Sequence, residues 1–447
     1  MITINTSIKF NDSLPDEVDV VVIGGGVIGI FSALNMMRKG LKVIVLEKGR
    51  IAGEQSSRNW GWIRQQGRDP AELPIMMEAS RLWEAVDKET NGRTGFKRQG
   101  VLYLSQSEAA QEKREAWLVN AKEHGLESYI VPGSGIGKYI HQSASEKNFW
   151  TGAIYTPSDA KAEPWQATPA IAELAHSEGV LIRENCAVRA LDIQAGQITA
   201  VVTEAGRIKT SQVVLAGGAW SSLFLRRHGI NIPQLSVRSS VARTVALDNV
   251  TMHSCADEGL AFRRRDDGGY TLAITDFEEH FIGPDSFRAL TKWGKTAMKN
   301  WQSIKLSINQ LKDSPDAWHT SRNWDENEVS PFEKMRVLDP APTPGKTKLM
   351  QQSFAKRFPH IGEPELLNTW AGMIDSMPDL VPVVDRVPSL EGLIVATGMS
   401  GHGFGIAPAF GKIIAEIASG ERSEHDLNRF RFSRFSDGSP LELGPGI

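Results

Sequence analysis

Residues 24–29, GGGVIG, have the spacing that most clearly implies chemistry. They match the pattern GxGxxG, whose glycines permit a tight turn, a close approach of the backbone to a diphosphate, and close packing of a helix on a strand. Glu47 follows roughly 20 positions later, where a carboxylate can accept hydrogen bonds from ribose hydroxyl groups and repels a 2′-phosphate. The pattern predicts dinucleotide binding, with NADP disfavoured, through Gly24, Gly26, Val27, Ile28, Gly29, Glu47 and Lys48.

A second glycine-rich segment, ATGMSGHGFGIAP at 396–408, precedes an expected helix. Reduced flavin gathers negative charge at one edge of its ring, and the free amides of a helix N-terminus stabilise such charge. NAD needs no second cradle of this kind, so the segment favours FAD. The expected contacts are Gly398, Ser400, Gly401, His402, Gly403, Phe404 and Gly405.

His402 within this segment has two interpretations. It could serve as a base or a covalent anchor, or it could make a structural hydrogen bond. The structural interpretation is favoured because hydride transfer to a flavin requires no base at this position.

The elements that position both glycine segments are strands and helices of a parallel sheet. Residues 18–23, VDVVVI, form an apolar run that ends in glycine, and periodic apolar residues over 28–37 predict a helix that stops at Gly40. Residues 41–47, LKVIVLE, predict a second strand, which completes a β-α-β unit. Glycine-ended strands return at 212–218 and 392–398, and a helix is predicted over 406–419. The nucleotide domain is therefore expected to combine both ends of the chain.

The pattern of residues in the middle of the chain differs from that at both ends. Residues 259–275 predict a hairpin that turns at 266–269, and residues 276–335 suit an inserted helical cap. We expect an α/β protein with a discontinuous nucleotide domain at 18–94, 151–234 and 351–447. The substrate domain is expected at 95–150 and 235–350, with α+β structure, a large antiparallel sheet and the small helical insertion.

Composition narrows the class of protein. The 447 residues are 41% hydrophobic and 23% charged, as in globular proteins, and the net charge of −3 supplies no footprint for nucleic acid. The two cysteines, Cys186 and Cys255, have no paired spacing, so neither a disulfide framework nor a metal site is indicated. The polar N-terminus lacks a signal peptide, and the most apolar run, 18–34, is interrupted by Asp19 and glycines. We expect a soluble, cytoplasmic protein without a membrane span.

Three further stretches carry a family resemblance: EKGRIAGEQSSR at 47–58, VVTEAGRIKTSQVVLAGGAWS at 201–221 and NEVSPFEKMR at 327–336. Together with the glycine pattern, they resemble the bacterial L-amino acid deaminases and L-amino acid oxidases of the D-amino acid oxidase and glycine oxidase superfamily. The likeness extends from about residue 18 to 420. It implies a Rossmann-like FAD-binding domain of the glutathione-reductase type known as GR2.

The resemblance also implies particular contacts. Ser56, Ser57 and Arg58 would lie along the cofactor, the backbone near Val188 would meet the adenine, and residues 59–66, NWGWIRQQ, would lie beside the flavin ring. Further cofactor contacts are expected from Trp60, Gly61, Trp62, Gly217, Gly218 and Trp220. No cysteine occurs in 368–405, where some relatives attach flavin covalently, so FAD is expected to bind non-covalently. The N-terminal membrane helix of the membrane-bound deaminases has no counterpart in this sequence.

The chemistry implied is removal of a hydride from the alpha carbon of an L-amino acid to flavin N5, which leaves an imine that water converts to a 2-oxo acid and ammonia. An arginine can clamp the substrate carboxylate with two parallel hydrogen bonds. The resemblance points to Arg263, and Arg64 is the competing candidate. Trp60, Trp62, Trp220 and Trp370 could line a pocket for large or aromatic side chains, and Gln66 could add a polar contact.

The electron acceptor and the substrate class have alternatives. Oxygen, reduced to hydrogen peroxide, is the leading expectation, and a quinone or protein acceptor is the second. Glycine, sarcosine or a D-amino acid could replace the L-amino acid, because one fold hosts several substrates. A flavin-containing scaffold without turnover is the non-enzymatic alternative. The sequence leaves the oligomeric state open, a homo-oligomer included.

Overall fold

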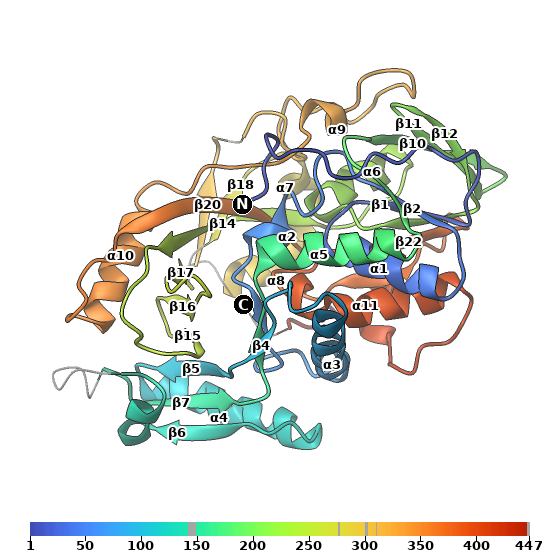
Figure 1. Cartoon of the computed structure of the whole chain (residues 1–447). Coiled ribbons are helices and arrows are strands. Elements are labelled where there is room, and N and C mark those ends of the chain that lie inside the picture. Colours follow the sequence, from blue (N-terminus) through green and yellow to red (C-terminus); the bar gives the residue numbers. More distant parts are fainter. Residues whose placement is uncertain (142–148, 276–277, 300–302, 310, 445–447) are drawn as a thin grey trace.

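The computed structural model describes residues 1–141, 149–275, 278–299, 303–309 and 311–444. Two large sheets dominate it, and in Figure 1 the parallel sheet with its helices lies on the right and the second sheet on the left. Segments of the predicted substrate domain at 142–148, 276–277, 300–302 and 310 lie outside the described residues.

The first sheet is a mostly parallel one of six strands within the described residues. Only its edge strand β21 runs antiparallel to its neighbour. The order is β21 (Val383–Arg386), β22 (Leu393–Thr397), β13 (Gln212–Leu215), β1 (Val20–Ile23), β2 (Val43–Leu46) and β9 (Leu181–Arg183). The predicted β-α-β unit is confirmed, because β1 and β2 pair in parallel and α1 (Val27–Arg38) connects them. Strands from both ends of the chain meet here, as the sequence predicts.

Both faces of this sheet are buried, which explains the continuous apolar runs of its strands. On one face, Val20 and Val22 belong to a core shared with α1, α5 (Pro164–Ser177), α3 (Leu73–Glu89) and α11 (Gly403–Ala418). On the other face, Val21 belongs to a core shared with α6 (Ser221–Arg227) and a three-stranded meander. The meander consists of β10 (Val188–Gln194), β11 (Gln197–Thr203) and β12 (Gly206–Lys209).

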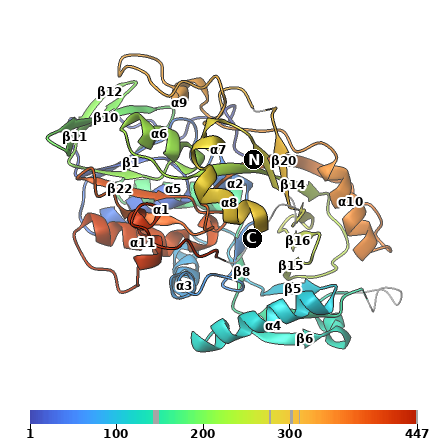
Figure 2. The same ribbon diagram turned by 180° about the vertical axis from the view of Figure 1, so that it is seen from behind.

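The second sheet has ten strands among the described residues. Its order is β19 (Ile304–Ser307), β18 (Glu278–Phe281), β14 (Leu235–Thr244), β17 (Tyr270–Ala273), β16 (Ala261–Arg264), β15 (Ser254–Ala256), β5 (Val101–Ser105), β7 (Gly152–Thr156) and β6 (Tyr129–Pro132), with β20 (Leu366–Ser376) also paired to β14. The predicted hairpin is confirmed, because β16 and β17 pair antiparallel across a turn at 265–269. Figure 2 shows this sheet from behind, with α7 and α8 in front of its junction with the parallel sheet.

A third group of short elements joins the two sheets. They include a separate small sheet in the order β3 (Trp62–Ile63), β8 (Ala160–Lys161) and β4 (Lys97–Arg98), whose strands lie in the sequence between strands of the two large sheets. The remaining helices are α2 (Gln55–Arg58), α4 (Glu108–Glu123), α7 (Pro284–Arg288), α8 (Leu290–Lys299), α9 (Pro331–Lys334) and α10 (Lys346–Arg357). None of the helices in the described ranges is both long and apolar enough to cross a membrane.

The strand pairing differs from the expected domain ranges at two places. Strand β20 lies within 351–447 and β7 within 151–234, yet β20 pairs along β14 and β7 pairs with β5. An apolar strand carries no local mark of the sheet it joins, so its sequence could not reveal this. The range predicted as a helical insertion, 276–335, contains α7, α8 and α9 but also strands β18 and β19. The division into domains stays a prediction.

Candidate functional site

The turn between β1 and α1 has the geometry that its glycines require. Gly24 has φ of +111°, a conformation that residues with a side chain rarely adopt. A Cβ on Gly29 would collide with the Gly24 carbonyl oxygen, so this glycine lets the helix pack against the turn. A Cβ on Gly26 would instead meet only Ser56 Oγ, at 3.1 Å. Gly26 therefore leaves the backbone open to a ligand at the start of α1.

Glu47 ends β2 next to that turn. Its Oε2 accepts a hydrogen bond from the Gly25 amide and its Oε1 one from the Gly49 amide, each at 2.7 Å. Burial raises the pKa of Glu47, although Lys48 and the two amides act in the opposite direction. The carboxyl group is thus held in place by backbone donors and presents its remaining acceptor capacity to the cavity it lines.

The second glycine segment forms a loop between β22 and α11. Gly398, Ser400 and Gly401 have positive φ angles, and Asp375 accepts the Gly398 amide at 2.7 Å. Burial raises the pKa of Asp375, which also accepts a hydrogen bond from Thr397 at 3.2 Å. Asp375 therefore fixes the loop, and the N-terminus of α11 opens towards the same cavity as the first turn.

One cavity connects the two glycine segments, with a volume of about 240 Å³. The structure places most of the predicted site residues on its wall. These are Gly24, Gly26, Val27, Ile28, Glu47, Lys48, Ser56, Arg58, Trp60, Trp62, Arg64, Val188, Gly217, Gly218, Trp220, Gly401, Gly403 and Phe404.

Other predicted cofactor residues lie behind this wall. They support it through packing or through hydrogen bonds to their neighbours, and they do not line the cavity. These are Gly29, Ser57, Gly61, Gly398, Ser400, His402 and Gly405. His402 Nδ1, for example, lies 3.1 Å from Glu72 Oε2, and burial together with Arg68 lowers the pKa of His402 to about 4.

The tryptophans occupy different places. Trp60 and Trp62 line the cavity with ring centres 5.6 Å apart. Trp220 lies near the first turn, where Lys48 Nζ is 4.3 Å from its ring centre and Glu54 accepts its indole N–H at 3.1 Å. Trp370 does not line the cavity, because its indole donates to the Arg58 carbonyl oxygen at 2.9 Å and its ring packs among buried residues. Trp60, Trp62 and Trp220 therefore line the cavity, and Trp370 does not.

Arg64 and Arg68 both line the cavity and are nearly fully buried. Arg64 donates to the Gln66 carbonyl oxygen at 2.6 Å, and Arg68 Nε donates to the Arg64 carbonyl oxygen at 3.2 Å. Among the described residues, Arg68 Nη1 is buried without a hydrogen-bond partner. Burial, and next the positive charge of Arg64, lower the pKa of Arg68 to about 9. This arrangement favours an anionic ligand, because an added negative charge would stabilise both arginines.

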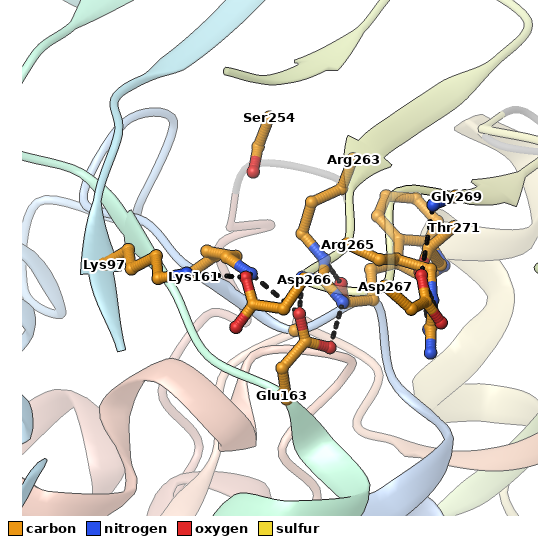
Figure 3. A network of polar contacts seen from close by, with 12 residues as sticks. Lys97, Lys161, Glu163, Ser254, Arg263, Arg265, Asp266, Asp267, Gly269 and Thr271 are labelled. Carbon is orange, nitrogen blue, oxygen red and sulfur yellow. Dashed lines mark hydrogen bonds and ion pairs between the residues drawn. The ribbon is translucent and has the colours of Figure 1, made fainter. Parts of the chain in front are cut away.

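Arg263 is placed differently from the expectation. Its guanidinium group does not line the cavity but pairs with Glu163, as Figure 3 shows, and its Nε donates to the Trp60 carbonyl oxygen at 2.7 Å. Glu163 also accepts a hydrogen bond from Lys161, which in turn pairs with Asp266. Both terminal nitrogens of the Arg263 guanidinium already donate to the buried Glu163 carboxylate, so they are not available to bind a substrate carboxylate in the same way. This geometry favours Arg64 as the carboxylate-binding arginine.

Gln66 is also outside the cavity. Its Nε2 donates to Thr156 Oγ1 at 2.9 Å and to the Ile154 carbonyl oxygen at 3.2 Å, which ties it to β7. Gln66 Oε1 is buried without a hydrogen-bond partner among the described residues, and a role for Gln66 in substrate binding stays a prediction.

Sequence reasoning missed several residues on the cavity wall. They include Arg68, Ile274, Thr275, Glu278, Asp375 and Met399. Arg68 had a visible signal, because it follows Arg64 by four residues in the same segment. Met399 lies within the second glycine segment, but its side chain is not part of the glycine pattern. The others lie on strands or loops of the second sheet, and no pattern in the sequence singles them out.

Comparisons with known proteins agree with the geometry. Residues 19–417 match the profile of the family described as FAD dependent oxidoreductase (DAO). The solved L-amino acid deaminase of Proteus myxofaciens, in complex with anthranilate, is 29% identical, with a TM-score of 0.91 and 97% of each chain covered.

Two curated mitochondrial proteins are more distant relatives. The pyruvate dehydrogenase phosphatase regulatory subunit of Mus musculus is 23% identical and the sarcosine dehydrogenase of Homo sapiens 20% identical, each over 94% of this chain. The chain spans only 44% and 42% of the lengths of these two relatives.

Proposed function

The chain belongs to the DAO family of FAD-dependent oxidoreductases, and from this premise we propose that it oxidatively deaminates an L-amino acid to a 2-oxo acid and ammonia. The observation that carries the proposal is the pair Arg64 and Arg68, which lie on the same cavity as both glycine segments. Similarity to the Proteus L-amino acid deaminase supports this substrate class.

The residues around the cavity fit FAD. Gly26 leaves space where a diphosphate would approach the N-terminus of α1, and Glu47 presents acceptors where a ribose would lie. At the other end, Gly401 and Gly403 line the cavity at the N-terminus of α11, where they would face the charged edge of the flavin. Neither Cys186 nor Cys255 lines this cavity, which supports non-covalent binding.

Bound FAD would supply the two-electron acceptor for the hydride that leaves the alpha carbon. The chain's own part is positional. Arg64, with Arg68 behind it, would bind the substrate carboxylate, because a planar guanidinium group can donate two parallel hydrogen bonds. Trp60 and Trp62 would exclude water and contact the substrate side chain, which favours large or aromatic amino acids.

The proposal has two alternative electron acceptors. Oxygen would give hydrogen peroxide, whereas a quinone or protein acceptor would make the protein a dehydrogenase. The alternative substrate is an N-methyl amino acid such as sarcosine, which the similarity to sarcosine dehydrogenase favours. Sarcosine, like an L-amino acid, has the carboxylate that Arg64 is proposed to bind.

The test is an anaerobic titration of the purified holoprotein with L-amino acids, D-amino acids, glycine and sarcosine. Bleaching of the flavin band at about 450 nm by L-amino acids alone is the expected result. Air is then admitted and peroxide is measured, which separates an oxidase from a dehydrogenase. A flavin spectrum that no amine changes would contradict the proposal and favour a scaffold without turnover.

A further inference from the structure

Glu278 begins β18 and lines the same cavity, although the proposed chemistry has so far given it no role. In the ladder between β14 and β18, Arg238 is opposite Glu279 and Val237 is opposite His280. One step further along, Ser239 comes opposite Glu278, and both residues line the cavity. Since successive side chains of a strand alternate between faces, Glu278 points to the cavity face of the sheet.

The Glu278 carboxyl group has no hydrogen bond or ion pair with the rest of the described chain. The charged neighbours on its own and adjacent strands lie on the opposite face, where Glu279 pairs with Arg238 and Lys305. On its own face, Ser239 of β14 and Ile304 of β19 are uncharged. His280 of β18 shares this face, but its ring nitrogens contact the Ser236 carbonyl oxygen and Ser286 Oγ, and burial lowers its pKa below 6.5, which favours the neutral ring. The remaining charged groups on the cavity wall are Glu47, Lys48, Arg50, Glu54, Arg58, Arg64, Arg68 and Asp375.

Burial alone raises the pKa of Glu278 to about 7. Other apolar or small residues of the wall surround this part of the cavity, namely Val241, Ile274, Thr275 and Ile374. A carboxyl group in such a place can exchange a proton near neutral pH, which is the property of an effective general base.

A row of paired residues relates Glu278 to Arg64. Tyr103 on β5, Ala256 on β15, Ala261 on β16, Ala273 on β17 and Val241 on β14 are opposite one another in successive ladders. The Arg64 guanidinium lies 5.4 Å from the Tyr103 ring centre, at one end of this row.

The other end of the row leads to Glu278. Strand β20 covers one edge of β14 over its whole length, so β17 and β18 share the other edge. Glu278 therefore lies beside Ala273, three strand spacings or roughly 14 Å from β5. The three alanines between these positions are small, and Trp60 and Trp62 pack over them. None of these three alanines lines the cavity, whereas Arg64 at one end of the row and Val241 at the other do, so both ends of the row face the same cavity as Glu278.

We propose that Glu278 is a catalytic residue whose carboxylate binds the ammonium group of the substrate and takes a proton from it, while Arg64 holds the substrate carboxylate. The inference rests on the proposed function. One N–H bond of the substrate breaks, its proton moves to a Glu278 oxygen and the electron pair stays on nitrogen. The neutral amine can then lose its alpha hydrogen as a hydride to FAD, as a C=N bond forms.

The test compares Glu278→Gln with Glu279→Gln, a matched control on the same strand whose side chain faces away from the cavity. The anaerobic rate of flavin reduction by an L-amino acid is measured from about pH 6 to pH 10. Wild type and Glu279→Gln should gain rate as pH rises through about 7. Glu278→Gln should lack this limb, react roughly 10²–10⁴-fold more slowly at neutral pH, and approach the wild-type rate at high pH, where the substrate amine is already neutral.

A second readout does not depend on turnover. The wild-type protein should show a carboxylic acid band in its infrared difference spectrum that titrates near pH 7, and Glu278→Gln should lack it. Glu278→Asp should keep the acidic limb with a lower rate, which guards against a folding defect. An unchanged pH profile in Glu278→Gln would overturn the assignment alone, whereas a wild-type flavin that no amine reduces would overturn it together with the proposed function.

Discussion

Arg263 and Glu163 form a bidentate ion pair inside the protein, with Nη1 to Oε1 at 2.9 Å and Nη2 to Oε2 at 3.0 Å. Both side chains are only 1% exposed. Because Arg263 Nε also donates to the Trp60 carbonyl oxygen, the pair connects β16 to the segment that carries the cavity tryptophans. We conclude that this arginine supports the cavity wall from behind.

Arg263→Ala should therefore reduce stability more than it reduces ligand affinity. Its removal leaves the buried Glu163 carboxylate with Lys161 as its remaining cationic partner, and breaking a buried pair costs about 3–5 kcal/mol. The free energy of unfolding, measured with urea, should fall by that amount. The Kd for benzoate, measured in the fraction that remains folded, should change much less than it does in Arg64→Ala.

The opposite pattern would return the clamp to Arg263. If Arg263→Ala unfolds at the wild-type urea concentration but no longer binds benzoate, the role proposed for Arg64 is wrong. Glu163→Gln serves as the control, because it removes the charge of the same pair and leaves Arg263 in place.

Arg64→Ala should weaken binding of carboxylate ligands. Arg64 lines the cavity, and loss of one partner of a buried, charged hydrogen-bonded pair typically costs about 2–5 kcal/mol. Benzoate, which no amine oxidation can consume, should therefore bind at least about 30-fold less tightly. A titration that follows the perturbation of the flavin spectrum measures this change, and FAD content should stay at the wild-type level.

Arg114→Ala is the matched control for that variant. The Arg114 guanidinium also lies 5.4 Å from the Tyr103 ring centre, but Arg114 does not line the cavity. Its substitution should leave the benzoate Kd unchanged. Equal losses of affinity in the two variants would show that the effect comes from disturbance of Tyr103.

The parts of the structure that the sequence predicts are those with local causes. The turn at Gly24, the close packing at Gly29 and the acceptor at Glu47 all follow from conformational needs within one β-α-β unit. The second glycine segment is predictable for a similar reason, since its positive φ angles and the helix after it are encoded within a few residues.

The features that the sequence does not predict depend on contacts between segments far apart in the chain. Strand alternation places Arg263 on a face of the sheet, but only the fold shows that Glu163, 100 positions earlier in the chain, occupies its guanidinium. Glu278 gives no signal in the sequence, because its significance depends on a cavity formed by segments from both ends of the chain. Trp370 is an aromatic residue of the type that often lines pockets, yet its indole N–H donates a hydrogen bond to the Arg58 carbonyl oxygen.

Gly26→Ala should lower FAD content without unfolding the protein. The added Cβ would lie 3.1 Å from Ser56 Oγ, on the wall where the diphosphate is expected. Overpacking of this size costs about 1–3 kcal/mol, so FAD affinity should fall by roughly 5- to 150-fold. The ratio of flavin to protein absorbance after dialysis measures the change, and circular dichroism checks the fold.

Gly294→Ala is the control for that substitution. Gly294 lies in α8 and does not line the cavity, and a Cβ added to it would meet no atom within 4 Å among the described residues. The variant should retain full FAD content, with a slight gain in stability from better helix propensity. Full FAD content in Gly26→Ala as well would contradict the proposed diphosphate position.

His402→Gln should make stability less sensitive to acid. Burial, with Arg68, lowers the pKa of His402 from 6.5 to about 4. Between these values the unfolded chain binds more protons than the folded one, so the free energy of unfolding falls as pH decreases from 6.5 towards 4. Glutamine does not titrate, so the free energy of unfolding of the variant should fall by about 2–3 kcal/mol less than that of wild type between pH 7 and pH 4.5.

Urea unfolding at a series of pH values measures how the free energy of unfolding of each protein depends on pH, with His176→Gln at an exposed histidine as the control. Parallel slopes in wild type and His402→Gln would mean that His402 binds protons equally in the folded and the unfolded protein, which would contradict its lowered pKa.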